Sequence, residues 1–183
     1  YNFVPFWNPA EPNDCCDNGI DSQENYAQHV GTGRLNDLPN GNSLAGVLEI
    51  INPNQQVIPG YTYIVSWPIG SSCAHSYYRS NSTGSWIAEK LKAQNAGGDL
   101  LVYNSVEEYQ FLVPGYANLA GVANTWIGLS QDDSSVDYSE PSGGWYWDDG
   151  TPIDNSASKL TYQLTFSLVG TPTGDEIVSI ISV

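Results

Sequence analysis

Alternation of apolar and polar residues predicts several β-strands in this chain. In residues 61–67 every second side chain is aromatic or Val and falls on one face of a strand, namely Tyr61, Tyr63, Val65 and Trp67. In residues 159–169 apolar side chains alternate with Thr, Gln and Ser, which is typical of a half-buried strand. Shorter apolar runs predict strands at 44–51, 99–103, 125–130 and 176–183; the segment 75–80 is another short predicted strand, and 145–152 is β-like.

Two helices are predicted from their end signals. Ser85 precedes the segment 86–96, which is followed by two glycines at the position where a left-handed C-terminal residue is expected. Ser105 and Glu108 form a capping box for the segment 106–112. The mixture of strands and helices predicts an α+β fold.

Residues 1–50 have loop composition, being rich in Asn, Asp, Gly and Pro. Large apolar residues interrupt this segment, so we expect a loop that is pinned to the rest of the protein. They are Phe3, Phe6, Trp7, Tyr26, Leu35 and Leu38.

Length and composition fit one domain, or one domain with a small appendage, because 183 residues of which 40% are hydrophobic can bury a sizeable core. The formal charge of −15 argues against binding to nucleic acid or to an anionic membrane, and makes divalent cations the natural counter-charge. A solvated acidic surface is the simpler interpretation for most of the acids. No apolar run approaches the ~20 residues of a membrane helix, so a soluble chain is expected, either processed or excerpted because it begins at Tyr1 and lacks Met.

Three cysteines cannot build a disulfide framework. Cys15 and Cys16 could close a vicinal ring, one of them could pair with Cys73, or they could be a pair of reduced, inert thiols. Asn81-Ser82-Thr83 is a glycosylation sequon that would be used only in a suitable secretory route.

Several segments together resemble the C-type lectin-like domain. The opening half of that family is matched at Tyr77-Tyr78, 85–112, 126–130 and 144–152, and the closing half at 6–14, 24–28, 33–39 and 46–50. The family's usual disulfide cysteines are replaced by other residues, namely Ala93, Tyr26, Pro39 and Leu48, so packing must supply stability instead.

The two halves stand in inverted order. We divide the chain into a closing half at 1–51, a β-like linker at 52–72, an opening half at 73–156 and a β-strand tail at 157–183. The domain could be circularly permuted, completed by a neighbouring chain, or cut from a tandem array. The apolar strands of the tail favour assembly into an oligomer or polymer, because an unpaired apolar edge strand invites pairing.

The resemblance implies a calcium site that also binds sugar. Calcium prefers six to eight oxygen ligands, and the family's ligand positions are occupied here by Glu11, Asn13, Glu24, Asn36 and Asp37. The resemblance also implies a cis peptide before Pro12. Vicinal sugar hydroxyls would complete the coordination and bond to Glu11, Asn13, Glu24 and Asn36. Glu-Pro-Asn, rather than Gln-Pro-Asp, suggests a mannose- or glucose-like sugar.

A second calcium is implied at Asp14 and Asn25. Its other ligands should come from the loop after residue 130, where Gln131 replaces an expected acid and where four acids could substitute, namely Asp132, Asp133, Asp137 and Glu140. Leu35 replaces the Trp that usually packs beside Asn36-Asp37.

Other candidate residues have simpler interpretations. Trp126, Trp145 and Trp147 are expected in the core, and His29 and His75 are expected to be ordinary surface or satisfied histidines without a matching partner. No nucleophile arrangement or phosphate-binding Gly loop emerges, so we expect no catalysis. The sequence therefore predicts a secreted or cell-surface carbohydrate-binding module of an adhesin or fibre. The alternative is a filament subunit that polymerises by strand or segment exchange, with calcium only structural.

Overall fold

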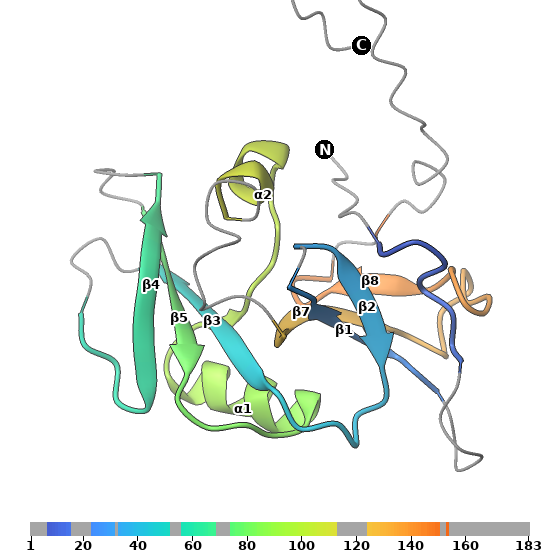
Figure 1. The fold of residues 1–183 in the computed structure, drawn as a ribbon, viewed down its shortest axis with the longest axis horizontal. Helices are drawn as coiled ribbons and strands as arrows, with labels where there is room; N and C mark the ends of the chain where they lie inside the picture. The colour runs from blue at the N-terminus through green and yellow to red at the C-terminus, as the bar shows by residue number, and fades with distance from the viewer. Residues whose placement is uncertain are drawn as a thin grey trace, which may run out of the picture.

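The computed structural model describes residues 7–15, 23–31, 33–51, 56–68, 74–112, 124–150 and 153. They form a mixed α+β fold, compatible with a C-type lectin-like fold, in which one sheet is accompanied by two helices (Figure 1). The strands are β1 Tyr26–His29, β2 Leu35–Leu38, β3 Ala45–Ile51, β4 Tyr61–Trp67, β5 His75–Ser80, β6 Asp99–Leu100, β7 Thr125–Gln131 and β8 Trp145–Trp147; the helices are α1 Trp86–Asn95 and α2 Val106–Leu112. The strands predicted at 159–169 and 176–183 lie outside the described residues.

The sheet has the strand order β2-β1-β7-β3-β5-β4, with β6 paired to β3 and β8 paired to β7. β3 runs antiparallel to β5 and parallel to β7, where Ala45 lies opposite Thr125. β1 runs antiparallel to β7. The strands of residues 26–51 therefore pair, within the same chain, with strands that come later in the sequence.

Most predicted elements are present, with three corrections. The strand predicted at 99–103 covers only Asp99–Leu100. In β4 the one-face alternation is broken because the register with β5 shifts between Tyr63 and Val65. The strands β1 and β2 were not predicted, because the segment 1–50 was interpreted as loop.

Both helices begin at the predicted caps. The Ser85 hydroxyl accepts a hydrogen bond from the Ala88 amide at 3.3 Å. Helix α1 ends at Asn95, and its C-cap Ala96 is followed by Gly97, whose φ of 90° is left-handed. At α2 the Ser105 hydroxyl accepts from the Glu108 amide at 3.0 Å. The Glu108 carboxylate does not return to Ser105 as in a full capping box; it accepts from the Asn104 amide at 2.8 Å.

Two hydrophobic clusters form the core, one around Leu101, Ile127 and Trp145, the other around Leu48 and Trp126. The predicted burial of the tryptophans is confirmed, with exposed fractions of 0% for Trp126, 1% for Trp145 and 5% for Trp147. Ala93 and Leu48, which replace cysteines of the resembled family, are both fully buried in the second cluster.

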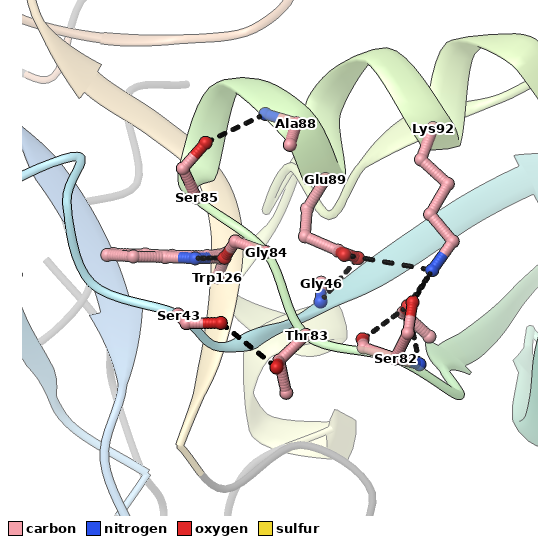
Figure 2. Close-up of polar contacts among 11 residues, drawn as sticks. Ser43, Gly46, Ser82, Thr83, Gly84, Ser85, Ala88, Glu89, Lys92 and Trp126 are labelled. Atoms are coloured by element: carbon pink, nitrogen blue, oxygen red, sulfur yellow. Dashed lines mark hydrogen bonds and ion pairs between the residues drawn. The ribbon is translucent and has the colours of Figure 1, made fainter.

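Polar contacts fasten β3 to α1, and β7 to the segment that precedes α1 (Figure 2). The Gly46 amide donates to Glu89 Oε2 at 3.0 Å, and Lys92 Nζ lies 3.7 Å from Glu89 Oε1. The Trp126 indole donates to the Gly84 carbonyl at 2.9 Å. Because Glu89 is only 3% exposed, its bond to Gly46 links residues 43 positions apart inside the protein.

We expect Gly98→Ala to destabilise the fold, because Gly98 packs closely against β3. A Cβ at Gly98 would lie 2.2 Å from the Glu49 carbonyl oxygen and 2.8 Å from Leu48 Cδ1, so the backbone would have to shift. The expected loss in the free energy of unfolding is about 1–3 kcal/mol, measured by urea denaturation. Gly41→Ala is the control, because nothing lies within 4 Å of its added Cβ. Equal stabilities for the two variants would contradict this packing.

Candidate functional site

The segment 7–15 is anchored to the sheet at its beginning. The ring of Trp7 packs edge-on against Trp145, with 4.9 Å between centroids. The Asn8 amide donates to the Leu35 carbonyl at 2.8 Å, which brings the segment beside β2. The Glu11–Pro12 peptide is cis, as the resemblance implied.

Asp37 anchors the other end of this segment. Its Oδ2 accepts hydrogen bonds from the amides of Asn13 at 3.0 Å and Asp14 at 2.9 Å. Glu24 Oε2 accepts from the Cys15 amide at 3.1 Å, and Asp14 Oδ1 accepts from the Glu24 amide at 3.0 Å. Side chains from residues 11–14, from Glu24 and from β2 therefore meet at one place, even though Glu24 is 7% and Asp37 only 1% exposed.

The acids of this group lie close enough to influence one another's ionisation. The pKa of Glu11 is raised to about 7, first by burial, then by the hydrogen bond to and the charge of Asp37, and by the charge of Glu24. Two ionised carboxylates have no donor to offer each other, so a shared proton or a cation must lie between them.

Two buried carboxylate oxygens without a hydrogen-bond partner indicate whether these residues fit a metal ion. Within the described ranges, Glu11 Oε2 and Asp37 Oδ1 are buried and have no hydrogen-bond partner. Such atoms are rare in folded proteins unless water or an ion satisfies them. Their oxygen chemistry suits Ca²⁺, so the residues present fit the ion that the resemblance implies.

The two asparagines take different positions in this arrangement. Asn13 Oδ1 accepts from the Cys15 amide at 2.8 Å, next to the carboxylates. In β2, Asn36 and Asp37 are consecutive and so point to opposite sides of the strand. The Asn36 amide nitrogen donates to the Asp37 carbonyl at 2.6 Å. The structure thus brings together Glu11, Asn13, Glu24 and Asp37, while the Asn36 side chain is engaged with its own strand.

The residues predicted for a second ion border the acidic loop. Asn25 Oδ1 is buried and, among the described residues, has no hydrogen-bond partner. The Gln131 amide donates to the Asn25 carbonyl at 2.8 Å, and Gln131 Nε2 lies 3.3 Å from Glu140 Oε2. Of the loop acids, Glu140 is thereby connected to Asn25, whereas Asp132 is hydrogen-bonded to Ser134. The side chains of Asp133 and Asp137 are exposed.

Cys15 is disulfide-bonded, so the alternative of a reduced Cys15-Cys16 pair is wrong. Its partner must be Cys16 or Cys73, and both lie outside the described residues. Asn81 is exposed at the end of β5, and its glycosylation stays a prediction.

The sequence analysis missed a second polar group. His75 Nδ1 is hydrogen-bonded to Glu49 Oε1, so His75 is a satisfied histidine, but the sequence did not identify this partner. Glu108 completes a set whose ligand atoms all lie within 4.8 Å of one another, the one such set of acids and histidines in the part of the chain that the structure describes. The capping pattern pointed to Glu108, but only as a helix cap. His29 is satisfied by Tyr103, as expected, and burial lowers its pKa to about 3.

Comparison with known proteins gives one informative match. The chain is 33% identical over 82 residues to the C-type lectin domain family 9 member A of Rattus norvegicus. This match supports a C-type lectin-like relationship. The matched part is 45% of this chain and 30% of the rat protein, so the chain spans less than a third of that relative's length. No protein-family model and no solved structure matches. None of the helices in the described ranges is long and apolar enough to cross a membrane.

The raised pKa of Glu11 predicts a pH-dependent stability in the absence of calcium. The folded-state pKa of about 7 lies above the ordinary value of 4.5, so the contribution of Glu11 to stability is fully present below pH 4.5 and is lost as the pH rises through 7. Melting temperatures in EDTA should therefore fall with rising pH more steeply for the natural protein than for Glu11→Gln. Glu107→Gln, at an exposed position of α2, should behave like the natural protein. Parallel curves for all three proteins would contradict the assignment.

Proposed function

We propose that this chain is a calcium-dependent carbohydrate-binding module of an extracellular adhesin or fibre. The observation that carries the proposal is the proximity of the Glu11 and Asp37 carboxylates, beside Glu24, with buried oxygens on Glu11 and Asp37 that have no hydrogen-bond partner among the described residues. Holding partly buried carboxylates close together, with oxygens that lack a hydrogen-bond partner, is unfavourable. A bound Ca²⁺ would remove that cost, which explains why the fold holds them together.

The surrounding residues have defined roles in this proposal. The ion, when bound, coordinates a pair of vicinal sugar hydroxyls. Glu11 and Glu24 accept hydrogen bonds from those hydroxyls, while the amide groups of Asn13 and Asn36 donate to them. For Asn36 this requires release of its bond to the Asp37 carbonyl.

Further support comes from the relative and from the pairing of the sheet. The rat protein carries "C-type lectin" in its name, but the chain covers only 30% of it, so sugar binding and a surface location remain proposals. The pairing of β3 with β5 and β7 inside one chain favours circular permutation over completion by a neighbour. A second calcium at Asp14 and Asn25, and the absence of catalysis, are part of the same proposal.

The proposal is tested by glycan binding with and without calcium. We expect binding to mannose- or glucose-type glycans on an array, lost in EDTA and restored by excess Ca²⁺. Asn13→Ala should weaken binding at least about tenfold, because it removes an oxygen ligand and a sugar contact. Calcium should also raise the melting temperature more at pH 7.5 than at pH 5, since it binds the ionised carboxylates.

Asn95→Ala provides the matched control, because Asn95 is exposed at the end of α1. It should bind like the natural protein. Glycan binding that persists in EDTA, or an equal loss of glycan binding in Asn13→Ala and Asn95→Ala, would contradict the calcium-dependent site. Calcium stabilisation without any glycan binding would leave the ion structural and favour the second candidate below.

The second candidate is a filament subunit that polymerises by strand exchange. The outer position of β4 favours it: among the described strands, β4 is last in the sheet and pairs only with β5. A seven-residue strand with one free side is a template for a strand from another chain. The apolar sequences 159–169 and 176–183 are the candidate donors.

Light scattering after size-exclusion chromatography tests this candidate. The full chain should form species that grow with concentration, and deleting residues 157–183 should yield a monomer. If the full chain stays monomeric at high concentration, strand exchange is rejected. Calcium removal separates the two functions, because polymer formation by strand pairing does not require the loop carboxylates.

A further inference from the structure

Glu49, His75 and Glu108 come from three different elements and meet beside the core. Glu49 lies in β3, His75 begins β5, and Glu108 lies in the first turn of α2. One ligand atom from each lies within 4.8 Å of the other two. Their exposures differ: Glu108 is 1% and Glu49 9% exposed, while the His75 side chain is 35% exposed. The group is therefore closed on one side and open at His75.

Hydrogen bonds from the surrounding structure orient both carboxylates. Glu49 Oε2 accepts from the Val102 amide at 2.9 Å, which leaves Oε1 directed at His75. Glu108 Oε2 accepts from the Asn104 amide at 2.8 Å, and Glu108 Oε1 accepts from the Tyr77 hydroxyl. Outer hydrogen bonds of this kind fix ligand orientation in metal sites.

The charges of this group are unequal. Two acids face each other across one histidine, and the pKa of Glu108 is raised to about 7, first by burial and then by the charge of Glu49. The hydrogen bond to Glu49 raises the pKa of His75. His75 is the one positive neighbour that lowers the Glu108 pKa. The single positive charge of a protonated His75 therefore does not neutralise both Glu49 and Glu108.

We propose that Glu49, His75 and Glu108 bind a divalent transition metal, best represented by Zn²⁺. The ligands are one oxygen from each carboxylate and His75 Nδ1, and water takes the fourth position on the open side. An imidazole nitrogen beside two carboxylates suits Zn²⁺, whereas Ca²⁺ prefers oxygen alone. Two carboxylate charges match the charge of the ion.

The geometry requires only a small adjustment. At bond lengths of about 2.0–2.2 Å, the ligand atoms of a tetrahedral zinc lie roughly 3.4 Å apart. The three atoms must therefore close up or separate slightly around the ion, and His75 Nδ1 exchanges its bond to Glu49 for the metal. Protons held by His75 and Glu108 are released to solvent as the ion binds, so affinity rises with pH.

The proposed zinc site shares no residue with the proposed calcium ligands, which are Glu11, Asn13, Glu24, Asn36 and Asp37. Calorimetry tests the zinc site. The full chain, saturated with Ca²⁺ and with its free thiol alkylated, is titrated with Zn²⁺ alone. We expect one site with proton release. His75→Gln and Glu108→Gln should each weaken binding at least about tenfold, and Tyr77→Phe should weaken it to a smaller extent.

Two matched variants identify the ligands. Glu107→Gln changes the exposed neighbour of Glu108 on the same helix, and Glu11→Gln changes the calcium loop; both should bind Zn²⁺ as the natural protein does. His75 and buried His29 are the protein's two histidines, so a zinc-induced change in the imidazole NMR signals is expected for His75. Circular dichroism checks that each variant is folded.

Several outcomes would overturn the proposal. They are absence of Zn²⁺ binding up to millimolar concentration, unchanged binding in folded His75→Gln, or Zn²⁺ binding that occurs in the calcium-free chain but not in the calcium-saturated chain. Each would reduce the group to a structural ion pair or an oxygen-type site, while leaving the glycan-binding test of the loop unaffected. Co²⁺ substitution adds a direct readout, because a four-coordinate nitrogen and oxygen site gives strong visible absorption that an adventitious surface ion does not.

Discussion

The insertion of β3 between β5 and β7 is the constraint on which the rest of the structure depends. It joins residues 45–51 to strands that lie up to 80 positions later, because Ala45 pairs with Thr125. Such pairing is costly in chain entropy, so it needs strong local compensation. The buried bond from Gly46 to Glu89 and the close contact of Gly98 with the Glu49 carbonyl supply that compensation.

The positions of the proposed calcium ligands also depend on pairing with later strands. β1 pairs with β7, β2 pairs with β1, and Asp37 in β2 then holds the amides of Asn13 and Asp14. Trp7 rests on Trp145 from the later part of the chain. The loop therefore carries the oxygen atoms, but the later strands orient them, and neither part could form this arrangement alone.

Some of this organisation could be predicted from the sequence, and the reasons for the failures are physical. Strands β3 and β7 are apolar runs, and α1 has clear caps, so local signals sufficed. β1 and β2 were missed because two of their four inward positions are polar, His29 and Asp37, which hides the alternation. The loop residues came from a family resemblance rather than from periodicity.

The two polar groups show how one chain handles buried acids in different ways. In the proposed calcium site, Glu11 lies near the acids Asp37 and Glu24, and the pKa of Glu11 rises to about 7. Beside the core, Glu49 and Glu108 share His75, yet the pKa of Glu108 also rises to about 7.

The partial charge of one histidine is thus too small to offset burial of two acids, and a protonated Glu108 fills the deficit at neutral pH and below. A divalent ion would neutralise the acids of either group without protonation of a carboxylate. The donor atoms then decide which ion fits: oxygen alone in the loop favours Ca²⁺, and the imidazole of His75 favours a transition metal. The two groups nevertheless use consecutive strands. Asp37 lies in β2, and the next strand, β3, contributes Glu49.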